Sequence, residues 1–594
     1  MCGICGEIFW DGRAADADHL RPMLDALQRR GPDDEGVWVE AQVALGHRRL
    51  AIIDLSPAGH QPMVDDELTL VFNGCIYNYR QLRVELEGLG HRFRSHSDTE
   101  VILKAFRQWG IDCLQRLEGM FAFALWDDHH QQLWLVRDRF GIKPLYYAPV
   151  AGGLRFASNV QALLAAGDVD TRIDPVGLHY QLTLHGVVPA PHTLLKGVRK
   201  VPPAHWLLMQ PNGELITRRW WSLKAQRPPA PKDEAEWVDY IHEGLQQAVR
   251  KRMQAADVPV GVLLSGGIDS SLIVALLAEA GAEDLRTFTI GFEDAPEEKG
   301  SEFAYADLVA EHYHTRHEKF LIANEAALRR LPEAVRAMSE PMFGQDAVGF
   351  YLLSEQVSQA VKVVQTGQGA DEVFGGYFWY PRMAAAQGHP VERFARHYFD
   401  RDHEEWLETV SPHYHVEDVT GALVEQALAQ PQADTFMDQV LRFDVTTLIV
   451  DDPVKRVDNM TMAWGLEARV PFLDHLLVER AFELPPALKL RDGGKYILKR
   501  IAQGRLPAAI INRPKVAFPM PALKYVRGDF YRFMRDILCS ERARQRGLFN
   551  PRYVEKLLQD PEAPWAYTAI QGSKLWQLAL LELWIQQVVE GVSW

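Results

Sequence analysis

Cys2 is the residue near the start of the chain that is best suited to chemistry; the chain opens Met1-Cys2-Gly3-Ile4. Methionine aminopeptidases remove Met1 when a small side chain follows, and removal would leave Cys2 with a thiol and a free α-amine. An α-amine has a pKa of about 7.7–8.0, so it can accept a proton near neutral pH. Cys2 could therefore be a nucleophile that carries its own general base. For Cys2 alone, a structural cysteine near a chain end is the alternative.

A second polar motif occurs about halfway along the chain, where residues 262–271 read VLLSGGIDSS. The pattern predicts a strand, a glycine-rich loop and a helix. Glycines let backbone N–H groups approach a phosphate, and a helix N-terminus favours negative charge. Asp269 would repel phosphates unless a cation such as Mg²⁺ lay between them. An ordinary strand-to-helix turn is the alternative, and no Gly-Lys-Ser/Thr follows, which excludes a Walker A loop.

Two further polar groups interrupt the apolar sequence of the first hundred residues. Asn73 and Gly74 are predicted to form a turn after a buried strand, where the amide and the N–H could stabilise an oxyanion. Ser97-Asp98-Thr99-Glu100 resembles a helix cap, with Asp98 or Thr99 accepting from the first N–H groups. Each group also has a purely structural explanation.

Composition limits the possible classes of protein. The 594 residues predict two to four domains, and 47% hydrophobic with 24% charged residues is ordinary for a globular protein. The formal net charge of −15 argues against general binding to nucleic acid or anionic membranes. Five irregularly spaced cysteines, together with no signal peptide or spanning apolar run, predict a cytoplasmic protein without disulfides. A zinc role for the Cys2–Cys5 pair is disfavoured because no second ligand pair is suitably placed, and a thioredoxin role because that motif follows a strand inside a βαβ unit.

The elements that must position these residues follow from apolar patterning. The first ~220 residues are predicted to be β-rich, with helices over 79–89 and 98–109. Residues 224–233 are proline-rich and polar, which indicates a stiff linker. After it, a helix over 234–253 and buried strands over 258–264, 287–291 and 361–366 alternate with helical segments. This order predicts a doubly wound parallel sheet, whose ligands bind beyond the carboxyl ends of its strands.

The motifs together resemble those of a known enzyme family. The amino-terminal set, which is similar to class II glutamine amidotransferase domains, comprises Cys-Gly-Ile, Arg-Gly-Pro-Asp, His-Arg-Arg-Leu, Asn-Gly, Asp-Thr-Glu and residues 137–146. The loop at 265–271 and the motifs at 369–377 and 464–474 resemble the synthetase domain of glutamine-dependent asparagine synthetases. The resemblance spans nearly the whole chain and weakens after about residue 530.

The resemblance implies an α/β protein built from two domains. Residues 1–223 would form an αββα glutaminase domain of the N-terminal-nucleophile hydrolase type, and residues 224–233 a linker. Residues 234–594 would form a doubly wound PP-loop ATP pyrophosphatase domain with a helical extension. An internal ammonia tunnel and a homodimer are further expectations from the family.

The resemblance also implies roles for individual residues of the glutaminase domain. Cys2 would attack the side-chain amide of glutamine to form a thioester and release ammonia. Asn73 and Gly74 would hold the oxyanion. Arg49 would bind the α-carboxylate of glutamine through its guanidinium fork. Asp98 would bind the α-ammonium.

In the synthetase domain the resemblance implies an ATP site, a metal site and a catalytic lysine. Asp269 and Asp371 would hold Mg²⁺, and Lys515 would stabilise charge during adenylation and amide formation. The residues implied to contact ATP are Leu263, Ser265, Gly266, Gly267, Asp269, Ser270, Ser271, Ile290, Thr366 and Gly367. The expected products are an amide, AMP, pyrophosphate and glutamate.

Two departures from asparagine synthetases fall at positions that should touch substrates. Cys75 replaces a Glu that helps to bind the ammonium of glutamine, and Gln368 replaces a Glu that lies near the aspartate acceptor. An acceptor with a blocked amine would need no charge at position 368. These departures resemble the subgroup of N-acetylglutaminylglutamine amidotransferases, which amidate the C-terminus of an acetylated dipeptide. Asparagine synthesis from aspartate remains the alternative.

Two other classes of protein were weighed against this one. A PP-loop ligase that modifies tRNA should carry a basic face, which the charge of −15 disfavours. A sensor of glutamine or ATP would not need Cys2, Asp269, Asp371 and Lys515 together. The predicted partners are therefore small molecules, with neither nucleic acid nor membrane.

Overall fold

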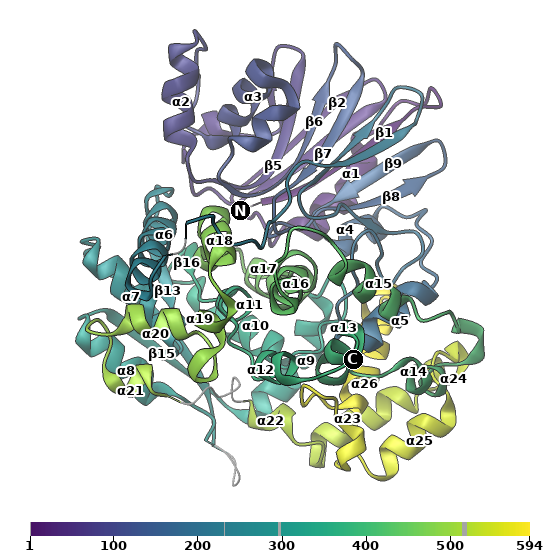
Figure 1. Ribbon diagram of the computed structural model, residues 1–594. Coiled ribbons are helices and arrows are strands. Elements are labelled where there is room, and N and C mark those ends of the chain that lie inside the picture. The colour runs from purple at the N-terminus through teal and green to yellow at the C-terminus, as the bar shows by residue number, and fades with distance from the viewer. Residues whose placement is uncertain (1, 231, 295–298, 514–519) are drawn as a thin grey trace.

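The computed structural model describes residues 2–230, 232–294, 299–513 and 520–594. Figure 1 shows two parts stacked on one another, with layered sheets from the amino-terminal residues above a larger, helix-rich part. This arrangement confirms the predicted α/β class. Lys515 lies outside the described residues, so its predicted role has no structural test here.

Two six-stranded antiparallel sheets face each other in the upper part. Their strand orders are β10-β8-β9-β1-β3-β2 and β12-β11-β7-β6-β5-β4. The strands are β1 (Cys2–Phe9), β2 (Asp34–Glu40), β3 (Val43–Arg49), β4 (Met63–Asp65), β5 (Leu68–Ile76), β6 (Gly119–Asp127), β7 (Gln132–Arg137), β8 (Tyr146–Val150), β9 (Gly153–Ala157), β10 (Arg199–Lys200), β11 (His205–Met209) and β12 (Leu215–Arg219).

Helices cover the outer face of each sheet, which gives the predicted αββα layers. The first sheet carries α1 (Ala17–Leu27) and α4 (Val160–Ala165), and the second carries α2 (Tyr79–Gly88) and α3 (Asp98–Trp109). Alternation along β1 explains the layering: Ile4 and Ile8 lie in the core between the sheets, whereas Cys5 and Phe9 pack with α1. Cys2 shares the parity of Ile4, so its side chain belongs to the inter-sheet side of the strand.

The lower part contains a five-stranded sheet with the order β15-β14-β13-β16-β17, in which every pair is parallel. Its strands are β13 (Val260–Leu263), β14 (Arg286–Phe292), β15 (Arg316–Ile322), β16 (Val363–Gln365) and β17 (Glu467–Arg469). The chain proceeds outward from β13 in one direction and then returns to its other side with β16. Such a reversal opens a ligand-binding crevice at the carboxyl ends of the two central strands.

The helices that contact strands of this sheet are α7 (Ile268–Glu279), α8 (Phe303–His312), α10 (Asp346–Val357) and α17 (Lys455–Met462), while α6 (Glu234–Gln254) packs on α7 and α9 (Asn324–Arg336) packs on α10. The rest of the chain is largely helical, as expected. Its helices are α5 (Pro175–Thr183), α11 (Ala370–Phe374), α12 (Trp379–Ala385), α13 (Pro390–Tyr398), α14 (His403–Thr409), α15 (Val419–Leu428), α16 (Phe436–Phe443), α18 (His475–Glu483), α19 (Pro486–Leu490), α20 (Tyr496–Ala502), α21 (Ala508–Ile511), α22 (Pro521–Lys524), α23 (Gly528–Leu538), α24 (Glu541–Arg546), α25 (Pro551–Gln559) and α26 (Lys574–Trp584).

The predicted helices agree with α2, α3 and α6 to within one residue at each end, and α3 has the predicted bounds. The three predicted parallel strands are present as β13, β14 and β16. The prediction of an Asn73-Gly74 turn is wrong, because both residues lie inside β5 and pair with Ala122 and Phe121 of β6. Long-range strand pairing here overrides the local turn preference of Asn-Gly.

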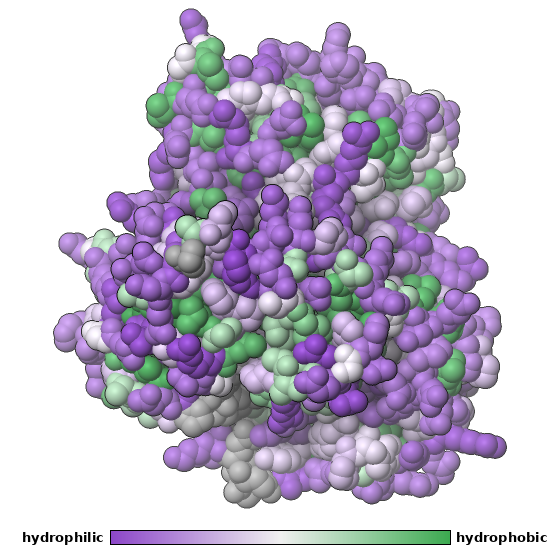
Figure 2. Space-filling view, in the orientation of Figure 1, coloured by the Kyte–Doolittle hydropathy of each residue, from purple (hydrophilic) through white to green (hydrophobic). Residues whose placement is uncertain are grey.

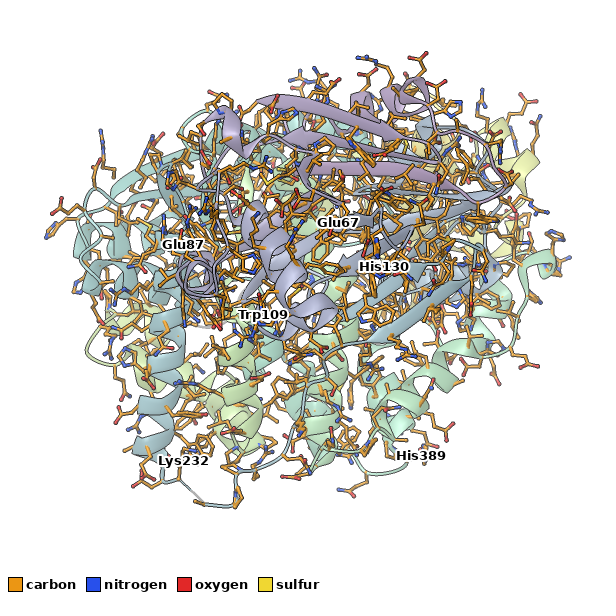
Figure 3. All side chains as sticks on the ribbon, turned by 90° about the horizontal axis from the view of Figure 1, so that it is seen from above. Glu67, Glu87, Trp109, His130, Lys232 and His389 are labelled. Carbon is orange, nitrogen blue, oxygen red and sulfur yellow. The ribbon has the colours of Figure 1, made fainter. Side chains whose placement is uncertain are left out.

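The segment 224–233 is attached to the lower part along much of its length. Ala225 forms a bridge with Ala433, and the guanidinium of Arg227 donates to both oxygens of Asp438 at 2.5 Å. Figure 3 shows Lys232 at the margin of the helical part, away from Glu67 and His130 of the sheets. The segment therefore leads from β12 along the helices to the start of α6.

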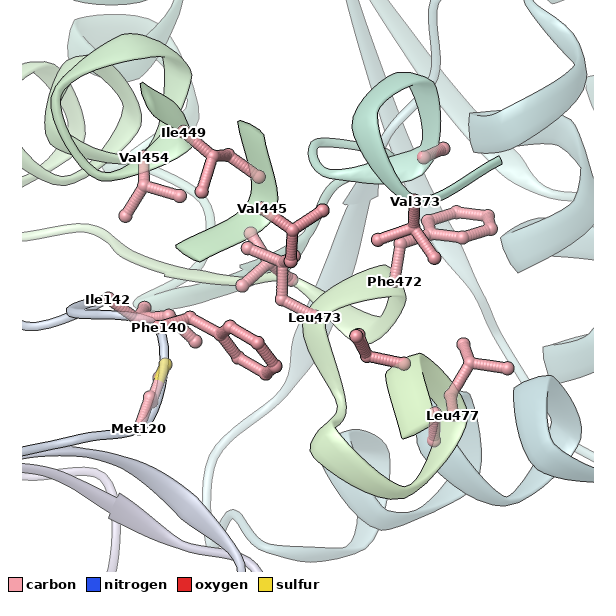
Figure 4. Packing of buried hydrophobic residues seen from close by; sticks show 14 of the residues in the cluster. Met120, Phe140, Ile142, Val373, Val445, Ile449, Val454, Phe472, Leu473 and Leu477 are labelled. Carbon is pink, nitrogen blue, oxygen red and sulfur yellow. The ribbon is translucent and has the colours of Figure 1, made fainter. Parts of the chain in front are cut away.

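An apolar interface joins the two parts. Figure 4 shows Met120, Phe140 and Ile142 of the upper part facing Val445 and Leu473 of the lower part, all within one buried cluster. The outer surface differs: on the face in Figure 2, hydrophobic residues form scattered patches among hydrophilic ones. None of the described helices is long and apolar enough to cross a membrane.

Candidate active sites

Cys2 begins β1 at the inner end of the sheets, next to the lower part of the molecule. It pairs with Arg49 of β3, and its side chain is 7% exposed. Burial raises the pKa of the Cys2 thiol, while a hydrogen bond from the Leu50 backbone and the charge of Arg49 oppose that rise. The thiol is thus protonated near neutral pH and needs a base to become a nucleophile.

Asn73 is the residue of β5 that meets the start of β1. Its Oδ1 accepts a hydrogen bond from the main-chain nitrogen of Cys2 at 3.0 Å. Its Nδ2 is buried and has no hydrogen-bond partner among the residues that the structure describes. A buried amide donor without a partner is costly, so a ligand oxygen beside Cys2 would satisfy it. The structure therefore brings the Asn73 amide, one of the predicted oxyanion donors, next to Cys2.

Arg49 lines the same pocket and is held by a loop that follows β3. Its guanidinium donates to the carbonyls of Ser56 at 3.2 Å and Ile53 at 3.4 Å, and also to the carbonyl of Asp54. A guanidinium has five N–H donors, so these bonds leave capacity for a carboxylate. The loop therefore fixes the orientation of Arg49 before any ligand binds.

Asp98 also lines the pocket, but it does not cap α3 as one reading of the sequence predicted. Ser97 is the N-cap residue, and its side chain accepts from the Thr99 backbone. The Asp98 carboxylate instead accepts from the backbone N–H of Ile76 at 3.0 Å. Burial raises the pKa of Asp98 to about 6, and the charge of Glu467 adds to the rise. A buried carboxylate in a pocket is poised to bind a cation.

Three polar residues of this pocket, Gln61, Glu467 and Arg469, were not predicted from the sequence. The Gln61 side chain connects β5 to α3: its Oε1 accepts from Phe72 N at 2.7 Å, and its Nε2 donates to Thr99 Oγ1 at 3.2 Å. Glu467 and Arg469 come from β17 of the lower sheet, so both parts of the molecule contribute. The pocket is lined by Cys2, Arg49, Leu50, Ile52, Ile53, Gly59, Gln61, Phe72, Gly74, Cys75, Ser97, Asp98, Thr99, Glu467 and Arg469.

Cys75 and Arg469 form the inner wall of this pocket. The Nε of Arg469 donates to Glu467 Oε1 at 2.6 Å, and its Nη2 donates to the Ala255 carbonyl at 2.9 Å. Although burial opposes it, the charges of Arg469 and Lys143 hold the pKa of Glu467 at about 2. Burial raises the pKa of Cys75 to about 12, so this thiol is neutral and offers no charge to a ligand.

The glycine-rich loop follows β13 and leads into α7, as predicted. Gly266 has φ +70°, and a Cβ there would lie 2.5 Å from Cβ of Tyr305 in α8. Ser265 and Ser270 close the loop through their hydroxyls, which lie 3.1 Å apart. Only glycine combines this backbone angle with this close approach. Within the loop, the N–H groups of Ser265 and Gly267 donate to the Ser270 and Ser265 hydroxyls, at 3.2 and 3.3 Å.

The other residues predicted to contact nucleotide surround this loop. Leu263 ends β13 and Ile290 lies in the neighbouring β14, both buried. Thr366 and Gly367 follow β16, and a Cβ on Gly367 would lie 2.9 Å from Cβ of Asp269. The structure thus brings them together at the carboxyl ends of the central strands.

Asp269 and Asp371 converge, and between them lies Lys495, which the sequence analysis missed. Lys495 Nζ lies 2.5 Å from Asp269 Oδ2 and 2.8 Å from Asp371 Oδ1. Burial would lower the pKa of Lys495, but these two carboxylates raise it. The Lys495 ammonium lies between two carboxylates, and carboxylate oxygens are also the ligands that Mg²⁺ prefers. No motif marks Lys495, so only the fold reveals it.

Gln368 lies half-buried in the turn between β16 and α11, next to Gly367. Nearby in α11, Glu372 accepts a hydrogen bond from the Tyr377 hydroxyl at 2.7 Å. Burial, with the charges of Asp444 and Asp371, raises the pKa of Glu372 to about 8. Gln368 itself carries no charge, and burial opposes a negative charge on Glu372.

Two family models match most of the chain. The model described as glutamine amidotransferase domain matches residues 1–221, and the model described as asparagine synthase matches residues 241–586. These matches correspond to the layered sheets and to the helix-rich part.

Full-length relatives agree with these matches. Asparagine synthetase [glutamine-hydrolyzing] 1 and 3 from Bacillus subtilis are each 30% identical; the first alignment covers 98% of this chain and 96% of the relative, the second 99% and 98%. The amidase chry2 from Gibberella zeae is 28% identical over 92% of this chain and 93% of its own length. Relatives of this length thus carry more than one name.

Proposed function

The chain belongs to the glutamine-hydrolysing asparagine synthetase family, and from that premise we propose that it amidates the C-terminal carboxylate of N-acetylglutaminylglutamine. The family makes it an ATP-dependent carbon–nitrogen ligase that takes its nitrogen from glutamine. The acceptor is the part that the proposal adds. The observation that carries it is the neutral side chain of Gln368, beside the nucleotide loop, at a position where the resemblance places a Glu.

The glutaminase half of the reaction would occur at the pocket of Cys2. Once Met1 is removed, the nitrogen that now donates to Asn73 becomes the α-amine, which can take the thiol proton. The sulfur then attacks the amide carbon of glutamine, and Nδ2 of Asn73 and Gly74 hold the oxyanion. Ammonia leaves, and water hydrolyses the thioester to glutamate. Arg49 and Asp98 would hold the two charged ends of the glutamine backbone.

The synthetase half would occur over the 265–271 loop. The acceptor carboxylate attacks the α-phosphate of ATP, pyrophosphate leaves, and ammonia then displaces AMP to give the amide. The loop and α7 would bind the phosphates of ATP, with Leu263, Ile290, Thr366 and Gly367 around the nucleotide. Asp269 and Asp371 would hold Mg²⁺, which would neutralise phosphate charge. Lys515 would support the same step.

Ammonia would travel between the sites within the two-domain arrangement of residues 1–223 and 234–594. The interface of Figure 4 supports this proposal, because apolar surroundings favour neutral ammonia over ammonium.

The proposed preference for an acceptor with a blocked amine rests on the charge at position 368. The ammonium of free aspartate would need a carboxylate at the position where the resemblance places a Glu, but this chain has the neutral Gln368 there. An acetylated amine carries no charge and requires none. Aspartate remains the alternative acceptor, because the Bacillus subtilis relatives are named asparagine synthetases.

The test supplies purified protein with ATP, Mg²⁺ and glutamine, and with either aspartate or N-acetylglutaminylglutamine. We expect the dipeptide amide by mass spectrometry, with equal amounts of AMP and pyrophosphate. Gln368→Glu should lower turnover of the dipeptide, because a new negative charge would face an uncharged cap. Efficient formation of asparagine by the unmodified protein would overturn the proposed acceptor.

A second experiment tests the nucleophile. Cys2→Ala should abolish glutamine hydrolysis but retain synthesis from added ammonium salts, because the nucleotide site does not use the thiol. The matched variant Cys113→Ala changes a buried cysteine elsewhere in the upper part and should retain both activities. Glutaminase activity in Cys2→Ala would contradict the assignment.

A further inference from the structure

His179, His403 and Asp418 form a cluster that neither half of the reaction uses. One ligand atom from each of the three side chains lies within 4.8 Å of the other two. His179 belongs to α5, His403 begins α14, and Asp418 precedes α15. In Figure 1, α5, α14 and α15 lie on the right, well apart from β13 and α7, which flank the nucleotide loop on the left.

Hydrogen bonding fixes the tautomer of His179. The Thr183 hydroxyl donates to the His179 carbonyl at 2.7 Å, since a carbonyl can only accept. The hydroxyl oxygens of Thr183 and Thr420 lie 2.7 Å apart, so Thr420 must donate this hydrogen bond and Thr183 must accept it. The single proton of Thr420 is then used, so Thr420 accepts from Nδ1–H of His179 at 2.8 Å. Neutral His179 consequently presents a lone pair on Nε2.

That lone pair points at two other ligand atoms. Nε2 of His179 lies 3.1 Å from Nδ1 of His403 and 3.9 Å from Oδ1 of Asp418. Ligand atoms about 2.0–2.1 Å from a tetrahedral Zn²⁺ lie about 3.3 Å apart, and the observed separations bracket this value. Without a metal, one imidazole must donate to the other, and the Asp418 carboxylate lies too far away for a hydrogen bond to Nε2.

The surroundings hold both rings in place. His179 is fully buried and its ring lies 4.5 Å from that of Trp406, while His403 stacks on the same tryptophan at 12°. A ligating histidine usually donates its remote N–H to an acceptor that fixes the ring orientation, and the Thr420 hydroxyl is such an acceptor for His179. We propose that His179, His403 and Asp418 bind one zinc ion that connects α5 to α14 and α15, with water as the fourth ligand.

The test compares zinc binding by metal-stripped full-length proteins, measured by equilibrium dialysis and by competition with a chromogenic chelator. Asp418→Asn is the mildest variant, because Asn can still cap α15. We expect His403→Gln to bind one zinc ion fewer per chain than the unmodified protein, and Asp418→Asn to bind zinc more weakly. Thr420→Val should weaken binding by about 10–100-fold, since it removes the acceptor that orients His179 but none of the three ligands.

The matched control is His415→Gln, a neighbouring histidine whose Nε2 contacts the Leu407 and Val410 carbonyls. It should retain the zinc site. Co²⁺ supplies an independent readout, with tetrahedral visible absorption in the unmodified protein and in His415→Gln but not in His403→Gln. Equal zinc content and equal Co²⁺ spectra in the unmodified protein and His403→Gln would overturn the proposal.

Discussion

At the scale of the residue, Asn73 connects the strand that begins with Cys2 to the proposed oxyanion site. Its Oδ1 holds the Cys2 nitrogen, and its buried Nδ2 has no partner among the described residues. We expect Asn73→Ala to lower kcat for glutamine hydrolysis by about 10²–10³-fold, because an oxyanion donor is lost. Ammonia-dependent synthesis should be unchanged. Asn78→Ala, which removes a bond to the Arg116 carbonyl away from Cys2, is the control; equal kcat in both variants would contradict the role.

The pKa of Asp98 predicts how glutamine use depends on pH. Above a pKa of about 6 the carboxylate is charged and attracts the ammonium of glutamine; below it, the carboxyl group is neutral. The kcat/KM for glutamine should therefore fall about tenfold per unit as pH drops below about 6. Asp98→Asn should lose this acid limb and bind glutamine weakly. A pH profile that is the same in both proteins would exclude Asp98 as the titrating group.

The raised pKa of Asp98 also predicts that an uncharged side chain at this position stabilises the protein. Folded Asp98 binds its proton more tightly than the unfolded chain does, because its pKa lies at about 6 rather than 3.8. The free energy of unfolding therefore decreases as pH rises through this window, by up to about 3 kcal/mol in total. Asp98→Asn can still accept from Ile76 and avoids the buried charge. We expect it to be about 1–3 kcal/mol more stable near neutral pH, measured by denaturant unfolding.

At the scale of the element, the glycine-rich loop depends on its close approach to α8. Gly266 and Gly281 both have positive φ, +70° and +77°, but only Gly266 has neighbours at a Cβ position. Gly281→Ala should cost about 1–2 kcal/mol from backbone strain alone. Gly266→Ala should cost about 1–3 kcal/mol more and raise the KM for ATP, while glutaminase activity persists. Equal effects of the two substitutions on stability and KM would refute a special role for the contact with Tyr305.

The elements also show what could be predicted from the sequence. Helix α3 has the predicted bounds because its signals are local: Ser97 caps it and its apolar residues recur at helical spacing. The Asn73-Gly74 turn was wrong because pairing with β6 is not a local property. Lys495 was missed because its partners, Asp269 and Asp371, are distant in sequence and meet it only after the parallel sheet forms.

At the scale of the whole molecule, the two parts share residues and charge. Glu467 and Arg469 of β17 line the pocket that Cys2 occupies. The motif containing them resembles a family motif, but its sequence position gives no reason to place it beside the amino terminus. Buried ions cross the same boundary: Lys200 Nζ contacts Glu340 at 2.8 Å and Asp451 at 2.6 Å. Such pairs require a fixed alignment of the two parts, since an unpaired buried charge is costly.

Asp458 provides the sharpest test of that alignment. It lies between Arg30 at 2.8 Å and Lys143 at 3.3 Å, and all three side chains are buried. Asp458→Asn leaves two buried cations facing each other and should lower the free energy of unfolding by about 3–5 kcal/mol. Arg30 also donates to the Cys2 carbonyl, so loss of its partner Asp458 should disturb the alignment of the two sites. Ammonia should then escape before it reaches the acceptor, and more glutamate should form per AMP. The control Lys362→Gln breaks a half-exposed pair with Asp33 across the same boundary and should cost at most about 1 kcal/mol. If Asp458→Asn matched that control in both stability and product ratio, the buried ions would not be what aligns the two sites.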